Sequence, residues 1–191
     1  MANEAPLPLL TIGVVADTHV PDRRQDLHPK LIPVLETAGV STILHAGDIS
    51  DPAVLAALSR VAPVKAVMGN RDWRIASLPM VVRLTLAGVP LVLTHGHGGW
   101  LGYIRSKIEY LNNGYHFEYY HKQLRRRFPE ARVVVFGHTH RVENRLVDGC
   151  LFFNPGAAYA CLENDQQPHV GLLSFYPEGR VEGRIINLDV Q

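Results

Sequence analysis

The fold of this 191-residue chain is indicated most clearly by residues 9–19, LLTIGVVADTH. The nearly continuous apolar run, rich in Ile and Val, is typical of a strand that is buried on both faces. It ends in Asp17-Thr18-His19, so that an acid and an imidazole follow directly after the strand. In α/β sheets, ligands bind beyond the carboxyl ends of the strands, so this position is a candidate binding position.

The same alternation continues through the first half of the chain. Helical patterns over residues 29–38 and 52–61 alternate with apolar strand patterns over residues 42–46 and 64–68. These two strands run into the polar motifs Gly47-Asp48 and Gly69-Asn70-Arg71-Asp72. A βαβαβ opening of this kind implies a parallel sheet.

The second half is richer in strands. An apolar hairpin of residues 81–86 and 90–94 runs into His95-Gly96-His97, and a strand over residues 133–136 runs into Gly137-His138-Thr139-His140. Four more short strands are predicted over residues 143–147, 151–154, 170–176 and 181–187. We therefore predict an α/β protein with two mixed sheets packed together and helices outside. No repeat or linker divides the chain, so residues 1–191 are expected to form a single domain.

A helical hairpin is predicted as an insertion at about residues 99–128, with Asn112-Asn113-Gly114 as its turn. Each helix has an apolar stripe that can pack on the sheet. Further aromatic residues remain, and such a surplus is typical of interfaces and ligand walls: Trp100, Tyr103, Tyr110, Tyr115 and Tyr119. We expect the hairpin to overhang the site and to provide a homodimer contact.

Composition narrows the functional classes. Hydrophobic residues make up 47% and charged residues 19%, as in ordinary globular proteins. The net charge of +1 gives no strong signal for nucleic-acid binding. Cys150 and Cys161 form no C-x-x-C motif, so neither a disulfide framework nor a thiolate zinc site is indicated. Without a secretory pattern in residues 1–8 or an apolar stretch of about 18 residues, we expect no membrane segment and a cytoplasmic location.

Side chains that bind metals follow five of the predicted strands. They are Asp17, His19, Asp48, Asn70, His95, His138 and His140. Taken singly, an Asp or Asn at a strand exit is better explained as a turn or cap residue than as a metal ligand. Taken together and in this order, they provide the carboxylate, amide and imidazole ligands that two neighbouring divalent cations need, with one carboxylate shared. The sequence therefore predicts a dinuclear metal site.

The motifs Asp-x-His, Gly-Asp, Gly-Asn-x-Asp, His-Gly-His and Gly-His-Thr-His resemble those of the calcineurin-like metallophosphoesterase superfamily, in particular its small bacterial and archaeal phosphodiesterases. Asn154-Pro155-Gly156 matches a further turn of that family. The resemblance implies a four-layer α/β/β/α sandwich. It also implies one metal held by Asp17, His19, Asp48 and His140, and a second held by Asp48, Asn70, His95 and His138, with Asp48 as the bridge.

These ligands imply a hydrolytic reaction. Two aspartates offset two of the four positive charges on a pair of divalent ions, which leaves positive charge for a phosphate. Water bound to such ions is acidic enough to provide a bridging hydroxide near neutral pH. We therefore predict a metal-dependent phosphoesterase acting on a small phosphate ester, by resemblance a phosphodiester. The ligands suit Mn²⁺, Fe, Ni²⁺ or Zn²⁺, of which the resemblance favours Mn²⁺.

One position departs from the family pattern. Many members carry a histidine after the Gly-Asn pair as an acid for the leaving group, whereas this chain has Arg71, which cannot release a proton. Arg71 either holds a phosphate oxygen or forms an ion pair with Asp72, which is itself expected to orient a metal ligand. His97 either contacts substrate or metal or is only hydrogen-bonded locally. We assign catalytic roles to Asp48, Arg71, Asp72 and His97.

A non-catalytic role is the main alternative. The same fold includes the retromer subunit, which resembles these enzymes and serves mainly as a protein-binding platform. Loss of metal ligands would indicate that role, but all seven candidate ligands are present here.

Overall fold

The computed structural model of the protein describes residues 6–75 and 77–190, which fold into two five-stranded sheets and four α-helices. The first sheet contains, in spatial order, β10 (Val181–Asn187), β9 (His169–Phe175), β1 (Leu10–Val15), β2 (Thr42–His45) and β3 (Val64–Ala66). The second contains β4 (Val81–Leu86), β5 (Val89–Thr94), β6 (Val133–Val135), β8 (Cys150–Pro155) and β7 (Val142–Val147). The helices are α1 (Leu31–Thr37), α2 (Pro52–Leu58), α3 (Gly99–Asn113) and α4 (Phe117–Arg127).

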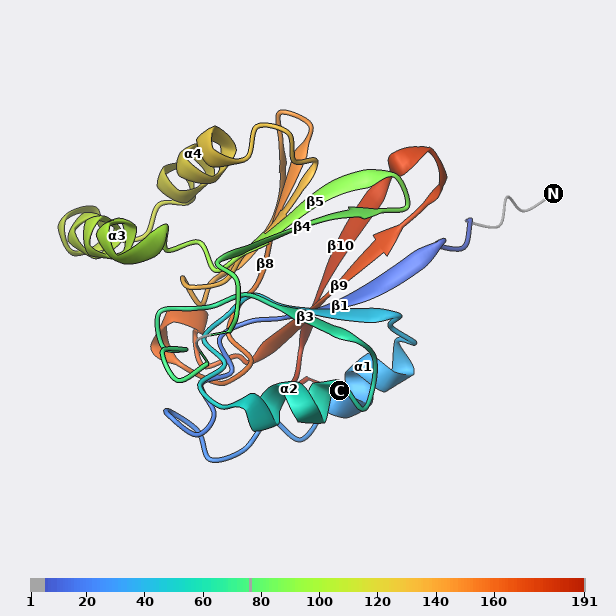
Figure 1. Ribbon diagram of the computed structural model, residues 1–191, viewed down its shortest axis with the longest axis horizontal. Coiled ribbons are helices and arrows are strands. Elements are labelled where there is room, and N and C mark those ends of the chain that lie inside the picture. Colours follow the sequence, from blue (N-terminus) through green and yellow to red (C-terminus); the bar gives the residue numbers. More distant parts are fainter. Residues whose placement is uncertain (1–5, 76, 191) are drawn as a thin grey trace.

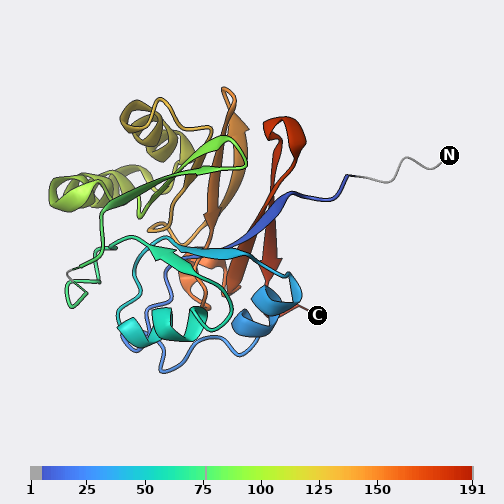
Figure 2. The same ribbon diagram turned by 45° about the vertical axis from the view of Figure 1, so that its right-hand side comes forward.

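The two sheets pack face to face, with α1 and α2 on the outer face of the first and with α3 and α4 beside the second (Figure 1 and Figure 2). Buried aliphatic side chains such as Val14 and Leu44 from the first sheet meet Leu91, Val135 and Phe153 from the second. Both sheets combine parallel and antiparallel pairs. The predicted α/β/β/α sandwich with two mixed sheets is therefore confirmed.

The strand directions determine where the site lies. Strands β1, β2 and β3 run parallel to one another, and so do β5 and β6. Because the carboxyl ends of parallel strands meet at one edge of a sheet, the loops that follow these five strands can meet at one rim of the sandwich.

The helical hairpin, α3 with α4, is asymmetric. From α4, Phe117 and Leu124 are buried against the second sheet. On α3 the expected apolar stripe faces solvent instead, because Ile104, Ile108 and Leu111 are 39%, 53% and 75% exposed. Packing of both stripes on the sheet is thus wrong for the described part of α3. The side chains of Trp100, Leu101 and Tyr103 lie outside the described residues.

Among the described residues, no helix has both the length and the apolar character needed to span a membrane.

Candidate metal centre

Five loops at the carboxyl ends of strands bring the seven predicted ligands to one rim of the sandwich. The loops follow β1, β2, β3, β5 and β6, and they carry Asp17 and His19, Asp48, Asn70, His95, and His138 and His140, in that order.

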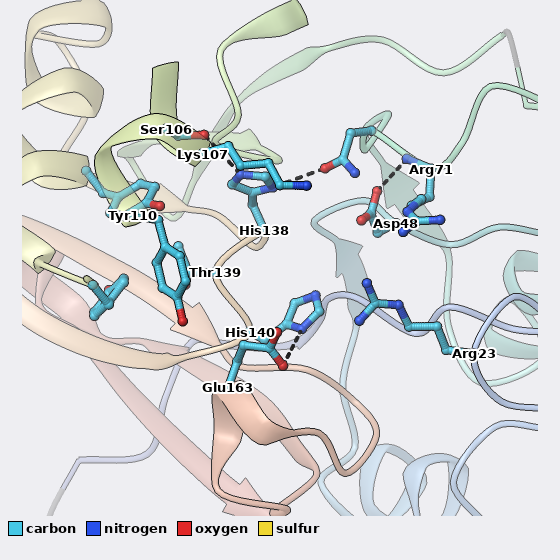
Figure 3. A pocket seen from close by; sticks show the side chains of 13 residues that line it. Arg23, Asp48, Arg71, Ser106, Lys107, Tyr110, His138, Thr139, His140 and Glu163 are labelled. Carbon is cyan, nitrogen blue, oxygen red and sulfur yellow. Dashed lines mark hydrogen bonds and ion pairs between the residues drawn. The ribbon is translucent and has the colours of Figure 1, made fainter. Parts of the chain in front are cut away.

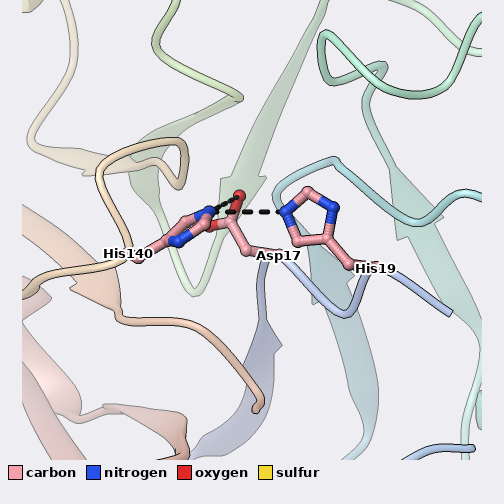
Figure 4. A group of neighbouring side chains, drawn as sticks. All are labelled: Asp17, His19 and His140. Carbon is pink, nitrogen blue, oxygen red and sulfur yellow. Dashed lines mark hydrogen bonds and ion pairs between the residues drawn. The ribbon is translucent and has the colours of Figure 1, made fainter. Parts of the chain in front are cut away.

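Asp17, His19 and His140 form the first group (Figure 4). The Nε2 atoms of His19 and His140 lie 3.3 Å apart, and Nε2 of His140 lies 3.6 Å from Oδ1 of Asp17. One ligand atom from each residue lies within 4.8 Å of the others. All three side chains are buried, so these atoms face a small space inside the protein.

Asn70, His95 and His138 form the second group, and Asp48 lies between the two groups. Oδ1 of Asn70 lies 3.1 Å from both Nε2 of His95 and Nδ1 of His138. Oδ2 of Asp48 is 3.5 Å from Nε2 of His19, and Oδ1 of Asp48 is 3.5 Å from Nε2 of His95. Each carboxylate oxygen of Asp48 thus faces one group, which is the arrangement expected of a bridging ligand.

The hydrogen bonding of His95 tests whether a cation fits here. Nδ1 of His95 lies 2.7 Å from the carbonyl oxygen of Ala46. A carbonyl only accepts, so Nδ1 carries the proton and Nε2 of the neutral ring has a lone pair. That lone pair faces the oxygens of Asn70 and Asp48, which are acceptors as well. Acceptor atoms that converge without a hydrogen between them fit a cation.

The backbone at these loops is unusual. Five of the seven predicted ligands have positive φ angles: Asp17 (51°), His19 (50°), Asp48 (55°), His138 (71°) and His140 (59°). Non-glycine residues adopt this conformation at a cost of about 1–3 kcal/mol each, and such strain concentrates at functional sites. His138 and His140 consequently point into different groups and not along one side of an extended segment. The cost is offset by the surrounding packing.

Close packing around Asp48 explains the glycine of the Gly-Asn motif. A Cβ atom on Gly69 would lie only 2.1 Å from Oδ1 of Asp48. Any side chain at Gly69 would therefore displace the carboxylate that lies between the two groups.

Burial determines the protonation of the site. It raises the pKa of Asp48 to about 7 and, together with the charge of Asp48, holds the pKa of Asp17 well above its usual range. Burial, followed by the effect of His140, lowers the pKa of His19 to about 2. Burial also lowers the pKa of His95 and of His140 to about 4. The imidazoles are thus neutral at physiological pH, as metal ligation requires.

Asp72 is fully buried and binds backbone, not Arg71. Its carboxylate accepts four backbone N–H groups, from Asp48 (2.9 Å), Ile49 (2.7 Å), Ser50 (2.8 Å) and Gly69 (2.8 Å). The expected ion pair between Arg71 and Asp72 is therefore wrong. The four amides satisfy both oxygens of Asp72 and connect it to the loop that carries Asp48.

Arg71 forms its ion pair with another residue. Nη1 of Arg71 lies 3.3 Å from Oδ2 of Asp22, in the loop after β1, and both side chains are partly exposed. The backbone N–H of Arg71 donates to Oδ1 of Asp48 at 2.8 Å. His97 lies behind the second group, with its ring centroid 5.2 Å from that of His95 and 6.0 Å from that of His138. It is buried, and its Nδ1 has no hydrogen-bond partner among the described residues.

Sequence reasoning missed three side chains beside the first group. Nη1 of Arg23 donates to the hydroxyl of Tyr159 at 2.7 Å, and the Tyr159 ring packs edge-on against His19 and His140. Oε2 of Glu163 lies 3.8 Å from Nδ1 of His140, on the side of the ring away from Nε2. Arg23 and Tyr159 lie in irregular loops and Glu163 lies in a short 3-10 helix, Leu162–Asn164, so that no periodic pattern marks any of them.

One cavity of about 230 Å³ opens onto both groups (Figure 3). Asp48, Asn70, His138 and His140 are among the residues that line it. In Figure 3, Arg23 and Arg71 lie on one side of His138 and His140, and Ser106, Lys107 and Tyr110 of α3 lie on the other. Oγ of Ser106 lies 3.5 Å from Nε2 of His138, so the helical hairpin directly adjoins the second group.

Residues 10–176 match the family model described as the calcineurin-like phosphoesterase superfamily domain. The chain belongs to this superfamily. A "probable metallophosphoesterase" of Methanothermobacter thermautotrophicus is 30% identical over 149 residues, which cover 78% of this chain and 77% of the relative. The resemblance inferred from the motifs is therefore confirmed.

Other proteins that are similar to this chain have different names. Vacuolar protein sorting-associated protein 29 of Schizosaccharomyces pombe is 29% identical over 78% of this chain and 72% of that protein. Among solved structures, vacuolar protein sorting 29 of Cryptosporidium parvum matches with a TM-score of 0.70 and 19% identity, covering 93% of this chain and 97% of the other. An archaeal phosphodiesterase matches with a TM-score of 0.65 and 21% identity, covering 93% and 100%. Similarity at these identities shows a shared fold.

Proposed function

We propose that the protein is a phosphoesterase with a dinuclear metal centre. In this proposal Asp17, His19, Asp48 and His140 hold one divalent cation, and Asp48, Asn70, His95 and His138 hold the other. The observation that supports it best is the position of Asp48, whose two oxygens lie 3.5 Å from nitrogens of different groups. Mn²⁺ is the proposed metal on the basis of the family resemblance, since the nitrogen and oxygen ligands suit Fe, Ni²⁺ and Zn²⁺ as well.

The remaining side chains suit the binding of a phosphate. When bound, the two cations would supply an activated water as the nucleophile and positive charge that stabilises the transition state. Arg23 and Arg71 line the same cavity and can bind the phosphate oxygens that face away from the metals. Asp72 acts through the backbone of Asp48 and is therefore a positioning residue. His97 is buried, and it is not among the described residues that line the cavity. We propose that it packs against His95 and His138.

We propose phosphodiesters as the preferred substrates. The resemblance to small bacterial and archaeal phosphodiesterases supports this choice, as does the archaeal phosphodiesterase that shares the fold. Neither arginine can release a proton to a leaving group, which disfavours simple alkyl esters.

Protein binding is the second candidate function. It is favoured by the similarity to the vacuolar protein sorting protein and by the exposed apolar stripe of Ile104, Ile108 and Leu111 on α3. The predicted homodimer contact would use the same stripe. Measured turnover of a phosphate ester distinguishes an enzyme from a scaffold.

The test is a panel of chromogenic phosphomonoesters and phosphodiesters assayed with and without added Mn²⁺. Hydrolysis that requires Mn²⁺ and favours diesters would support the proposal. Metal binding without hydrolysis of any ester would contradict it and favour the scaffold.

A further inference from the structure

The hairpin wall of the cavity carries aromatic side chains that the metal chemistry does not use. Tyr110 of α3, Tyr115 of the turn between the helices and Tyr120 of α4 line the cavity. The cavity volume of about 230 Å³ equals roughly seven or eight water molecules at about 30 Å³ each. It can therefore hold a phosphate together with part of a further group.

Two of the three tyrosines are fixed by contacts within the protein. The hydroxyl of Tyr115 donates to Glu143, and the ring of Tyr115 is stacked on that of Tyr120 at 5.5 Å. The guanidinium of Arg141 lies 5.1 Å from the centroid of Tyr115. Both rings are thus built into the base of the hairpin and have little freedom to move.

Tyr110 differs from them because it is 43% exposed while it lines the cavity. It lies three residues after Lys107 on α3, so the two side chains share one face of the helix, and both line the cavity on the same side of His138 (Figure 3). An aromatic ring that is partly exposed beside a phosphate site can stack with a ring of the ligand.

We infer that the helical hairpin forms a ring-binding subsite next to the metal centre, and that the substrates are phosphodiesters with an aromatic ester group. The inference rests on the proposed phosphoesterase function. The phosphate would lie between the two arginines and the metal-binding groups, with the ring against Tyr110.

A phenolic leaving group suits the side of the cavity that carries Arg23 and Arg71. Hydrolysis forms a P–O bond to the oxygen of water and breaks the P–O bond to the ring oxygen, which departs with the electron pair while the proton of water passes to solvent. A phenol has a pKa of about 10, against about 15.7 for water, so a phenolate departs without a donated proton more readily than an alkoxide does. Arg23 and Arg71 supply positive charge and no proton.

Binding of non-hydrolysable ligands tests the subsite apart from catalysis. With Mn²⁺ present, we expect phenylphosphonate to bind about three- to ten-fold more tightly than methylphosphonate by calorimetry, which is the size of effect that ring stacking gives. Tyr110→Ala should bring the ratio of the two dissociation constants close to one, and Tyr110→Phe should leave this ratio unchanged. Ile108→Ala, an exposed change on the same helix outside the cavity lining, is the matched control and should keep it as well. A wild-type ratio near one, or a ratio that Tyr110→Ala leaves unchanged, would overturn the inference.

Hydrolysis of methyl 4-nitrophenyl phosphate and phenyl 4-nitrophenyl phosphate separates this inference from the proposed function, since the leaving group is the same. A higher KM in Tyr110→Ala for the phenyl ester, or for both esters, supports the subsite. Cleavage of both esters with KM values that Tyr110→Ala does not change would refute the subsite and leave the phosphoesterase intact. No cleavage of either ester, with the phosphonate ratio preserved, would refute the phosphoesterase alone.

Discussion

The carboxylate of Asp72 accepts the backbone N–H of Asp48 at 2.9 Å, and this bond connects two loops that follow neighbouring strands. The same carboxylate also binds the amides of Ile49, Ser50 and Gly69. A buried aspartate therefore holds the residue that lies between the two groups of predicted ligands in its left-handed conformation. The site is supported by backbone geometry as much as by its side chains.

Asp72→Asn should destabilise the protein by about 2–4 kcal/mol, because the amide nitrogen of Asn cannot accept two of the four N–H groups and bonds to a charged acceptor contribute about 1.5–3 kcal/mol. Urea unfolding measures this loss. Asp51→Asn is the matched control, because Asp51 caps α2 through Ala53 and Asn caps helices equally well. Equal stability of the two variants would refute the positioning role.

Arg71→Ala should lower kcat/KM for phosphodiesters about ten- to a hundred-fold, or roughly 1.4–3 kcal/mol, with the metal content unchanged, because a fork that binds phosphate is lost. If Arg71 acts only as the partly exposed partner of Asp22, the change in stability would be at most about 1 kcal/mol and the kinetics would not change. Asp22→Asn is the control that removes the ion pair and keeps the arginine, with its metal content measured as well because Oδ2 of Asp22 also lies 3.8 Å from Nδ1 of His19.

Arg71→His should increase the cleavage of simple alkyl esters, because a histidine can donate the proton that arginine retains. Rates for matched alkyl and aryl esters would measure the gain. No change in any ester class would contradict the account of the leaving group.

The fully buried His45 should make the metal-free protein less stable in acid. Burial lowers the pKa of His45 to about 4, whereas the unfolded chain takes up a proton below about 6.5. The contribution is thus fully present above pH 6.5 and is lost as pH falls toward 4, which amounts to about 2 kcal/mol at pH 5. In EDTA, the fall in the free energy of unfolding from pH 7.5 to 5 should be smaller by this amount in His45→Gln. An identical fall in both proteins would contradict the assignment.

The fold and the grouping of the candidate ligands follow from local patterns. The apolar runs that end at Asp17, Asp48 and Asn70 mark buried parallel strands, and the parallel direction brings their ends together. Such patterns contain no information on partners in irregular loops. The partners of Asp72 are backbone amides, which every residue offers, so sequence alone suggested its charged neighbour Arg71 instead.

The hairpin shows the other limit of sequence reasoning. The apolar periodicity of α3 predicts one buried face, yet Ile108 and Leu111 face solvent while Tyr110 lines the cavity. Periodicity indicates that a helix has two faces but does not indicate which of them another part of the protein covers. Arg23 and Glu163 were missed because a charged residue in a turn or in a three-residue 3-10 helix belongs to no periodic pattern.

Metal stoichiometry tests the central proposal most directly. Purified protein loaded with Mn²⁺ and freed of excess metal should retain two ions per chain and hydrolyse phosphodiesters, whereas Asp48→Asn should retain fewer than two and lose turnover, because the charge that lies between the two groups is removed. Asn70→Ala should be milder, since it removes one neutral ligand. A wild-type protein that binds one ion or none, or an Asp48→Asn protein with two ions and the wild-type rate, would contradict the dinuclear centre.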